Sequence, residues 1–261
     1  MSGVAPVGQS AKPYVTVRDL TMAYGSFVIM RDMAFTINQG DVFIIMGGSG
    51  SGKSTLLRHL IGLNQPAGGE IFYGNQEFTR ADAIQREQIL RGTGVLFQSG
   101  ALWSSMTLAE NIGLLLEEYT DLSPAEIGEV AALKLALVGL KGFEDYYPSQ
   151  ISGGMQKRAG LARAMALDPG ILFFDEPSSG LDPISARLLD ELILDLRDSL
   201  GTTVVVVTHD LASIFTIGTN SIFLDADRKT ISAQGPPKEL LAQTQDPQLR
   251  SFLTRGGTEH V

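Results

Sequence analysis

Short apolar runs recur along the chain, separated by polar segments of helical composition. Some runs are apolar at every position, as in strands buried on both faces of a sheet, and others alternate, as in half-buried strands. These runs predict strands at 14–17, 35–37, 42–46, 95–97, 171–174 and 204–207. The segments between them predict helices at 53–60, 108–119, 123–140 and 183–200. Strands that alternate with helices at this spacing indicate a parallel sheet with crossover helices.

A helical insert interrupts this alternation at about residues 99–165, which contain few β-branched runs. We therefore expect a core over residues 13–235 that carries a helical sub-domain. Residues 1–12 are predicted to form a flexible arm and residues 236–261 a C-terminal tail. The tail has one apolar helical face, formed by Leu249, Phe252 and Leu253. That face either packs on its own domain or contacts a second subunit or an accessory protein.

Composition narrows the class of protein. The chain has 261 residues, no Cys and a formal net charge of −9. The negative charge disfavours non-specific DNA binding, because attraction to phosphate backbones needs a basic face. Without Cys there are no disulfides and no Cys-ligated zinc, which fits a reducing compartment. No apolar run approaches the roughly 20 residues of a spanning helix, and the first residues lack a secretory pattern, so we expect membrane contact only through a partner.

A glycine-rich segment joins the apolar run at 42–46 to the helix at 53–60 and matches G-x-x-x-x-G-K-[ST]. Its glycines allow successive backbone N–H groups to surround phosphate oxygens, and the helix N-terminus adds positive potential. Lys53 is expected to bind the terminal phosphates of a nucleotide, and Ser54 to be a ligand of Mg²⁺. The predicted nucleotide-binding residues here are Gly47, Gly48, Ser49, Gly50, Ser51, Gly52, Lys53, Ser54 and Thr55.

Two carboxylates, Asp175 and Glu176, follow the apolar run at 171–174. Asp175 is predicted to hold the magnesium ion and Glu176 to polarise the attacking water as general base. For the pair taken alone, a solvated acidic turn is the alternative. His209 follows the run at 204–207, at the end of a strand where parallel sheets bind their ligands, and is interpreted as a catalytic sensor of the γ-phosphate.

Two further residues are candidates for contacts with the nucleotide and its metal ion. Gln98 follows the run at 95–97 and is predicted to contact the magnesium ion or the attacking water. Tyr24 precedes the phosphate loop and can stack on an adenine ring, with a packed surface tyrosine as the alternative. His59 is expected to be structural, and His260 lies in the tail.

Residues 151–158, with the sequence Ile-Ser-Gly-Gly-Met-Gln-Lys-Arg, resemble the signature of ABC-type ATPases. The other motifs stand in that family's order: Tyr24, the phosphate loop, Gln98, the signature, the acidic pair, Ser179-Gly180-Leu181-Asp182 and His209. The resemblance, over roughly residues 14–235, implies an ATPase that uses ATP and Mg²⁺. It also implies an α/β fold: a P-loop NTPase core with a mixed sheet flanked by helices, an ABC-type helical sub-domain and an N-terminal antiparallel β sub-domain.

In this family two nucleotide-binding domains pack head to tail, so the resemblance implies a dimer that encloses ATP between its copies. Ser152, Gly153 and Gly154 are then expected to contact the γ-phosphate held by the other copy, because their N–H groups lie at a helix start. Asp182 is expected in the loop that links the two sites. The chain departs from the usual signature at Met155, where the family has Gln, and a thioether cannot replace the hydrogen bonds of an amide.

Three segments, at 97–103, 151–164 and 174–183, resemble more narrowly the MlaF family, the ATPases of bacterial Mla phospholipid-transport systems. This resemblance implies a peripheral protein on the cytoplasmic face of the inner membrane. Its partners are then a permease like MlaE, an MCE-domain lipid-binding protein like MlaD and often a STAS-domain subunit like MlaB. Phospholipid as cargo rests on the resemblance alone, so another cargo, such as an amino acid or a metal, stays open.

Two other classes are less well supported. A non-transport ABC ATPase would be expected to carry a long coiled coil or a basic arm, and a P-loop kinase would not need the signature or His209. For a transport ATPase, the permease is expected to dock at residues 99–116, just after Gln98. Trp103 lies in that segment and suits an interface, with a buried core aromatic as the alternative.

Overall fold

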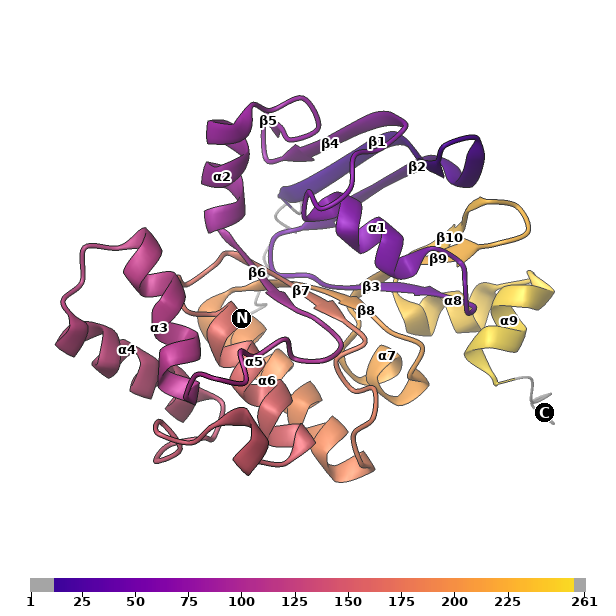
Figure 1. Ribbon diagram of the computed structural model, residues 1–261. Helices are drawn as coiled ribbons and strands as arrows, with labels where there is room; N and C mark the ends of the chain where they lie inside the picture. The colour runs from indigo at the N-terminus through magenta and orange to yellow at the C-terminus, as the bar shows by residue number, and fades with distance from the viewer. Residues whose placement is uncertain (1–11, 256–261) are drawn as a thin grey trace, which may run out of the picture.

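The computed structural model describes residues 12–255, which form two sheets with helices packed around them (Figure 1). The strands are β1 Pro13–Tyr24, β2 Phe27–Asn38, β3 Val42–Gly47, β4 Gly68–Tyr73, β5 Gln76–Glu77, β6 Thr93–Leu96, β7 Ile171–Asp175, β8 Thr203–Val207, β9 Asn220–Asp225 and β10 Thr230–Gln234. The helices are α1 Lys53–Leu60, α2 Ala83–Arg91, α3 Leu108–Tyr119, α4 Pro124–Leu137, α5 Gly153–Ala164, α6 Pro183–Leu200, α7 Leu211–Ile217, α8 Pro237–Gln243 and α9 Pro247–Leu253. A 3₁₀ turn spans Pro148–Gln150. Of the predicted arm, only Lys12 lies within the described residues.

The larger sheet has the order β10-β9-β3-β8-β7-β6, and all neighbours in it are parallel except β10 with β9. Its central strand β3 is buried on both faces, as its uninterrupted apolar run predicts. Val42, Ile44 and Met46 join the core on one face of the sheet, and Phe43 and Ile45 join the core on the other. The carboxyl ends of β3, β7 and β8 therefore lie along one edge, where the candidate motifs follow them.

The smaller sheet is antiparallel, with the order β2-β1-β4-β5, and the predicted fold class is confirmed. Helix α1 lies between the two sheets (Figure 1), with Leu56, Leu57 and Leu60 buried in their shared core. The sequence predicted only the start of β1 and the end of β2. In the rest of both strands, register shifts interrupt the alternating pattern. Asp19 in β1 and Asp32 in β2 have positive φ angles of 47° and 53°, which marks these irregularities.

The insert is helical in the structure, as predicted: between β6 and β7 the described chain contains α3, α4, the 3₁₀ turn and α5, and no strand. The first two helices begin with capping boxes, formed by Thr107 with Glu110 and by Ser123 with Glu126. Their apolar faces join the core under the larger sheet through residues such as Ile112 and Leu135.

The described part of the tail packs on its own domain. Leu249 and Leu253 are 1% and 3% exposed, and the rings of Phe252 and Phe223 lie 5.3 Å apart. This is the first of the two alternatives for the apolar face of the tail. No helix within residues 12–255 is long and apolar enough to cross a membrane.

Candidate active site

The phosphate-loop sequence connects β3 to α1 and has a shape that needs glycine. A Cβ on Gly47, whose φ is 155°, would lie 2.5 Å from Ser51 Oγ and 2.7 Å from the backbone oxygen of Leu224. Gly52 precedes α1 in the left-handed conformation, with φ 86°, and no side chain caps this helix. The first N–H groups of α1 are therefore left for a ligand, which is the arrangement that binds phosphate.

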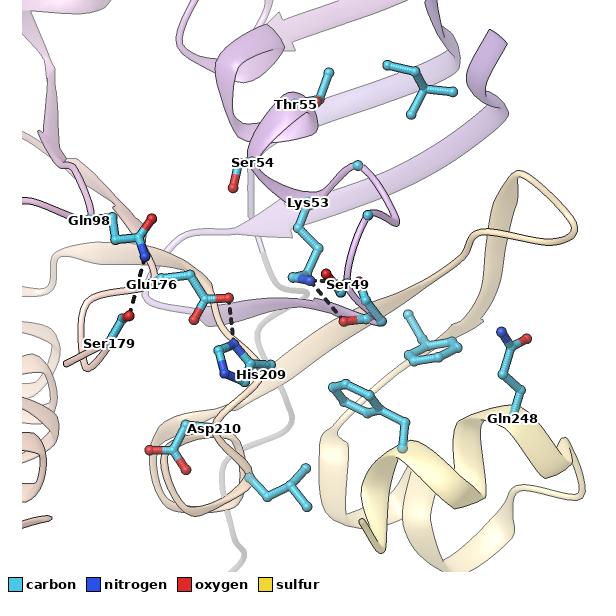
Figure 2. A pocket seen from close by; sticks show the side chains of 18 of the residues that line it. Ser49, Lys53, Ser54, Thr55, Gln98, Glu176, Ser179, His209, Asp210 and Gln248 are labelled. Carbon is cyan, nitrogen blue, oxygen red and sulfur yellow. Dashed lines mark hydrogen bonds and ion pairs between the residues drawn. The ribbon is translucent and has the colours of Figure 1, made fainter. Parts of the chain in front are cut away.

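Lys53 lies over this loop and close to the acidic pair. Its Nζ donates to the backbone oxygens of Gly47 and Gly48, each at 2.9 Å (Figure 2). Burial lowers the pKa of Lys53, and the carboxylates of Glu176 and Asp175 oppose that shift. The fold thus brings the cation and the two carboxylates into one site from segments more than a hundred residues apart.

Two of the predicted magnesium ligands are in contact. Ser54 Oγ donates to Asp175 Oδ1 at 2.8 Å, and Asp175 is buried at the end of β7. Hydroxyl and carboxylate oxygens are the ligands that Mg²⁺ prefers, so this pair fits the ion. Gln98, the third predicted ligand, lines a cleft together with Ser54, but its amide Nε2 donates to Ser179 Oγ at 3.3 Å.

Glu176 and His209, which lie 33 residues apart in the sequence, are hydrogen-bonded. His209 Nδ1 lies 2.8 Å from Glu176 Oε1 (Figure 2), and with an ionised carboxylate the proton is assigned to Nδ1. Glu176 has a left-handed φ of 49°, and its N–H donates to the backbone oxygen of Val207 at 2.8 Å. Such unfavourable backbone conformations in non-glycine residues are concentrated at functional sites.

One cleft of about 1550 Å³ is lined by Lys53, Ser54, Gln98, Glu176 and His209. Tyr24 lies in its wall with an exposed ring, and its hydroxyl accepts from Asn64 Nδ2 at 3.3 Å. Phe27 is paired with Tyr24 across a two-residue turn, lines the same cleft and is 65% exposed. Sequence reasoning missed Phe27, although directly opposed residues of a hairpin place their side chains on the same face.

The C-terminal helix α9 forms part of the same cleft and was also missed. The cleft is lined on this side by Gln248, Ser251, Phe252 and Arg255. Figure 2 shows Gln248 projecting from this helix on the opposite side of the view from Gln98. No motif in the tail signals this position, because it depends on the packing of α9 against β9.

The predicted signature residues lie elsewhere. Ser152 caps α5, accepting the N–H of Met155 on its Oγ at 3.3 Å, and Ser152 and Gly153 are exposed. Met155 packs against the core. None of the signature turn, which we define as Ser152, Gly153 and Gly154, lines the cleft.

Asp182 is outside the cleft lining as well, and its carboxylate caps α6. Oδ1 accepts the N–H groups of Ile184 and Ser185, each at 3.0 Å. Oδ2 accepts Ser185 Oγ at 2.6 Å, and this hydrogen bond is the main reason that the pKa of Asp182 is lowered.

This fold is shared with solved structures of ATP-binding cassettes, and two of them illustrate the likeness. The dimeric post-hydrolysis state of the ATP-binding cassette MJ0796, bound to ADP and Pi, has a TM-score of 0.77 and 31% identity, covering 85% of this chain and 98% of that one. The structure of cbiO1 from Clostridium perfringens, part of the ABC transporter complex cbiONQ, has a TM-score of 0.81 and 25% identity, covering 89% of this chain and 92% of that one.

Sequence comparison agrees with the fold. The protein named "Probable ribonucleotide transport ATP-binding protein mkl" of Mycobacterium tuberculosis is 42% identical over 95% of this chain and 67% of its own length. The "Intermembrane phospholipid transport system ATP-binding protein MlaF" of Escherichia coli K12 is 38% identical over 94% of this chain and 90% of its own length. Residues 30–179 match the ABC transporter family model. The chain therefore belongs to the ABC transporter family and is an ATP-binding and ATP-hydrolysing member of it.

Proposed function

We propose that this chain is the ATPase subunit of a transporter that moves phospholipid between membranes, and that two copies enclose ATP between them. The paired site is inferred because, within one chain, the signature turn lies apart from the cleft that holds the other nucleotide-site residues. The cleft contains the phosphate loop, Glu176 and His209, whereas the signature turn lies outside it, with Ser152 and Gly153 exposed. A single chain thus presents the two parts of a nucleotide site on different surfaces.

Within one cleft, each group has a distinct task. The α1 N-terminus and Lys53 bind the terminal phosphates of ATP, and Tyr24 stacks on the base. Glu176 accepts the proton of the attacking water, while His209 holds that carboxylate in place and faces the γ-phosphate. Ser54 and Asp175, with Gln98, would hold Mg²⁺, which neutralises charge on the phosphates when bound.

The second copy completes the site with its signature turn. The proposal draws on the dimeric MJ0796 structure bound to ADP and Pi, and on the exposure of Ser152 and Gly153 here. Both helix N-termini, α1 of one copy and α5 of the other, then contact the same phosphates. Hydrolysis removes the γ-phosphate between them, so the closed dimer loses contacts that the open state does not need.

The paired site is tested by ATP-dependent dimerisation. Glu176→Gln is expected to form a stable dimer with ATP and Mg²⁺, measured by light scattering after size exclusion. Adding Gly153→Asp should abolish that dimer, because a carboxylate then faces the phosphates of the partner's ATP. A Cβ at Gly153 meets no atom within 4 Å, so the chain itself can accommodate the substitution.

Gly128→Asp in the same Glu176→Gln background is the matched control, since Gly128 also lies on a helix with open space around its Cβ. It should leave dimerisation unchanged. An undiminished dimer in the Gly153→Asp/Glu176→Gln chain would rule out the paired site.

The cargo is inferred from relatives. MlaF carries phospholipid transport in its name, and this chain covers 90% of its length. The mkl protein, at 42% identity, carries ribonucleotide transport in its name, so a ribonucleotide is the second candidate. Phospholipid is preferred because the MlaF match extends over nearly all of both proteins.

The permease is proposed to bind beside Gln98, on the cytoplasmic face of the inner membrane. Trp103 is 59% exposed, so it is not the buried core aromatic of the alternative. Its backbone is held by buried Asn111, whose Oδ1 accepts the Trp103 N–H at 2.7 Å and whose Nδ2 donates to the Trp103 oxygen at 3.1 Å. A fixed backbone with a projecting indole suits an anchoring contact.

Purification from native membranes tests cargo and partners together. A tagged chain is expected to bring down a permease like MlaE, an MCE-domain protein like MlaD and a STAS-domain subunit like MlaB, with phospholipid detected in the solvent extract by mass spectrometry. Trp103→Ala should reduce recovery of the permease, whereas Tyr119→Ala, at a partly exposed aromatic of α3, should not. A complex that takes up ribonucleotides and holds no phospholipid would favour the second candidate.

A further inference from the structure

The side chain of Lys157 ends in a buried ammonium group. It lies on α5, the signature helix, which begins at the signature turn and here meets two segments of the active site. The residue is 7% exposed, and its Nζ donates to the backbone oxygen of Gln98 and, at 3.4 Å, to that of Glu176. Both acceptor residues line the cleft with their side chains. One cation on α5 therefore contacts the backbone at two positions of the catalytic apparatus.

Because Lys157 carries a buried charge, the position of α5 relative to Gln98 and Glu176 matters for stability. Burial lowers the pKa of Lys157, while the carboxylates of Glu176 and Asp175 oppose the shift. A buried cation is tolerated only where hydrogen-bond acceptors replace water. Any movement of α5 away from Gln98 and Glu176 would leave the ammonium without them, so the helix and these residues are held together.

The packing of α5 supports the same conclusion. A Cβ on Gly160 would lie 2.9 Å from the backbone oxygen of Gly100, so the helix approaches the segment after Gln98 closely. Further along the helix, Arg163 Nη2 donates to the same Gly100 oxygen at 3.3 Å. Lys157 is the residue that extends this contact to Glu176, which is held in its left-handed conformation.

We propose that Lys157 is a positioning residue that ties the signature helix to Glu176 and Gln98. The inference rests on the proposed function, in which the signature turn contacts ATP bound to the partner copy. One end of α5 then completes one ATP site, while Lys157 on the same helix supports the general base of the other. Each copy's Lys157 thus couples the two ATP sites of the dimer mechanically.

The test is Lys157→Met in the full chain, with a methionine of similar length that has no charge and no donor. The expected kcat for ATP hydrolysis falls roughly 10- to 100-fold, because displacement of a catalytic group by about 1 Å has effects of this size. The dissociation constant for ATP should change less than about threefold, since the phosphate loop is untouched. Cooperativity between the sites should also decrease, seen as a Hill coefficient closer to unity.

Lys134→Met is the matched control, because Lys134 is 4% exposed, lies on α4 and pairs with Asp168 away from the cleft. It removes a buried ammonium without contact to Gln98 or Glu176, and kcat should stay within about twofold. The proposal is overturned if Lys157→Met loses no more kcat than Lys134→Met, or if kcat and ATP affinity fall together.

If Lys157→Met does not yield folded protein, Lys157→Gln, which retains a hydrogen-bond donor, is judged by the same two measurements. Failure of the proposed function is distinguishable, because it would be seen in the unsubstituted chain as hydrolysis without dimerisation. Hydrolysis without dimerisation would exclude coupling between two ATP sites. An unchanged kcat in Lys157→Met alone would exclude the role of Lys157 but not the paired site.

Discussion

The N-termini of helices α1 and α5 both lie in segments that contain serine and glycine, yet they are built differently. The first follows Gly52 in the left-handed conformation, has no side-chain cap and opens into the cleft at the end of a buried strand. The second is capped by the hydroxyl of Ser152 and is exposed. An uncapped helix start needs an external group for its N–H donors, whereas a capped one is stable without it. The α1 terminus is thus suited to hold nucleotide within one chain, and the α5 terminus to meet nucleotide presented by another.

The largest expected effect comes from a substitution that changes ATP hydrolysis but leaves the N-termini of α1 and α5 intact. Glu176→Gln leaves the two helix N-termini unchanged and should lower kcat at least about 100-fold, because an amide cannot accept the proton of the attacking water. ATP binding should persist, so phosphate release and nucleotide binding are measured on the same preparation. Glu191→Gln, at an exposed carboxylate paired with Arg187, is the control and should have full activity. Full activity in Glu176→Gln would remove the role proposed for this carboxylate.

The next effect concerns the α1 turn alone. Lys53→Ala should weaken ATP binding roughly 10- to 100-fold, since hydrogen bonds to a charged group contribute about 1.5–3 kcal/mol. Titration calorimetry measures the affinity, with Lys141→Ala at an exposed site as the control. An unchanged affinity would mean that the terminal phosphates bind away from Lys53, and the contrast between the two turns would lose its basis.

Much of the site was accessible from sequence because its motifs are contiguous with the strands that carry them. A phosphate loop follows β3 and the acidic pair ends β7, and neighbouring parallel strands bring such termini to one edge. Contacts between distant side chains were not accessible. The Glu176–His209 hydrogen bond, the Lys157 contacts and the position of α9 depend on packing that no local pattern records.

The fold shows the same division. Helices with strong caps, such as those starting after Ser123 and Asp182, were predicted to within a few residues because their signals are local. The hairpin of β1 and β2 was predicted only in part, since bulges near Asp19 and Asp32 disturb the alternation on which strand prediction depends.

A matched pair of glycine substitutions sharpens the comparison. Gly52→Ala should destabilise the chain by about 1–3 kcal/mol, because φ is 86° and the new Cβ would lie 2.9 Å from Ile29 Cγ2. Gly153→Ala, outside the left-handed region and with no atom within 4 Å of its Cβ, should be neutral or stabilising by up to about 1 kcal/mol. Urea unfolding without nucleotide measures both. Equal losses of stability would contradict the view that only the α1 turn depends on its glycine geometry.

The smallest expected effect tests the cap itself. Ser152→Ala removes the acceptor for the Met155 N–H and should cost about 1 kcal/mol, or roughly 2–4 °C in Tm for a chain of this size. Ser49→Ala, in the phosphate loop before the uncapped α1, should change stability by less than about 0.5 kcal/mol. Thermal unfolding without nucleotide separates the two. If the serines proved equivalent, the α5 terminus would not be stabilised from within, and it too would need nucleotide to form.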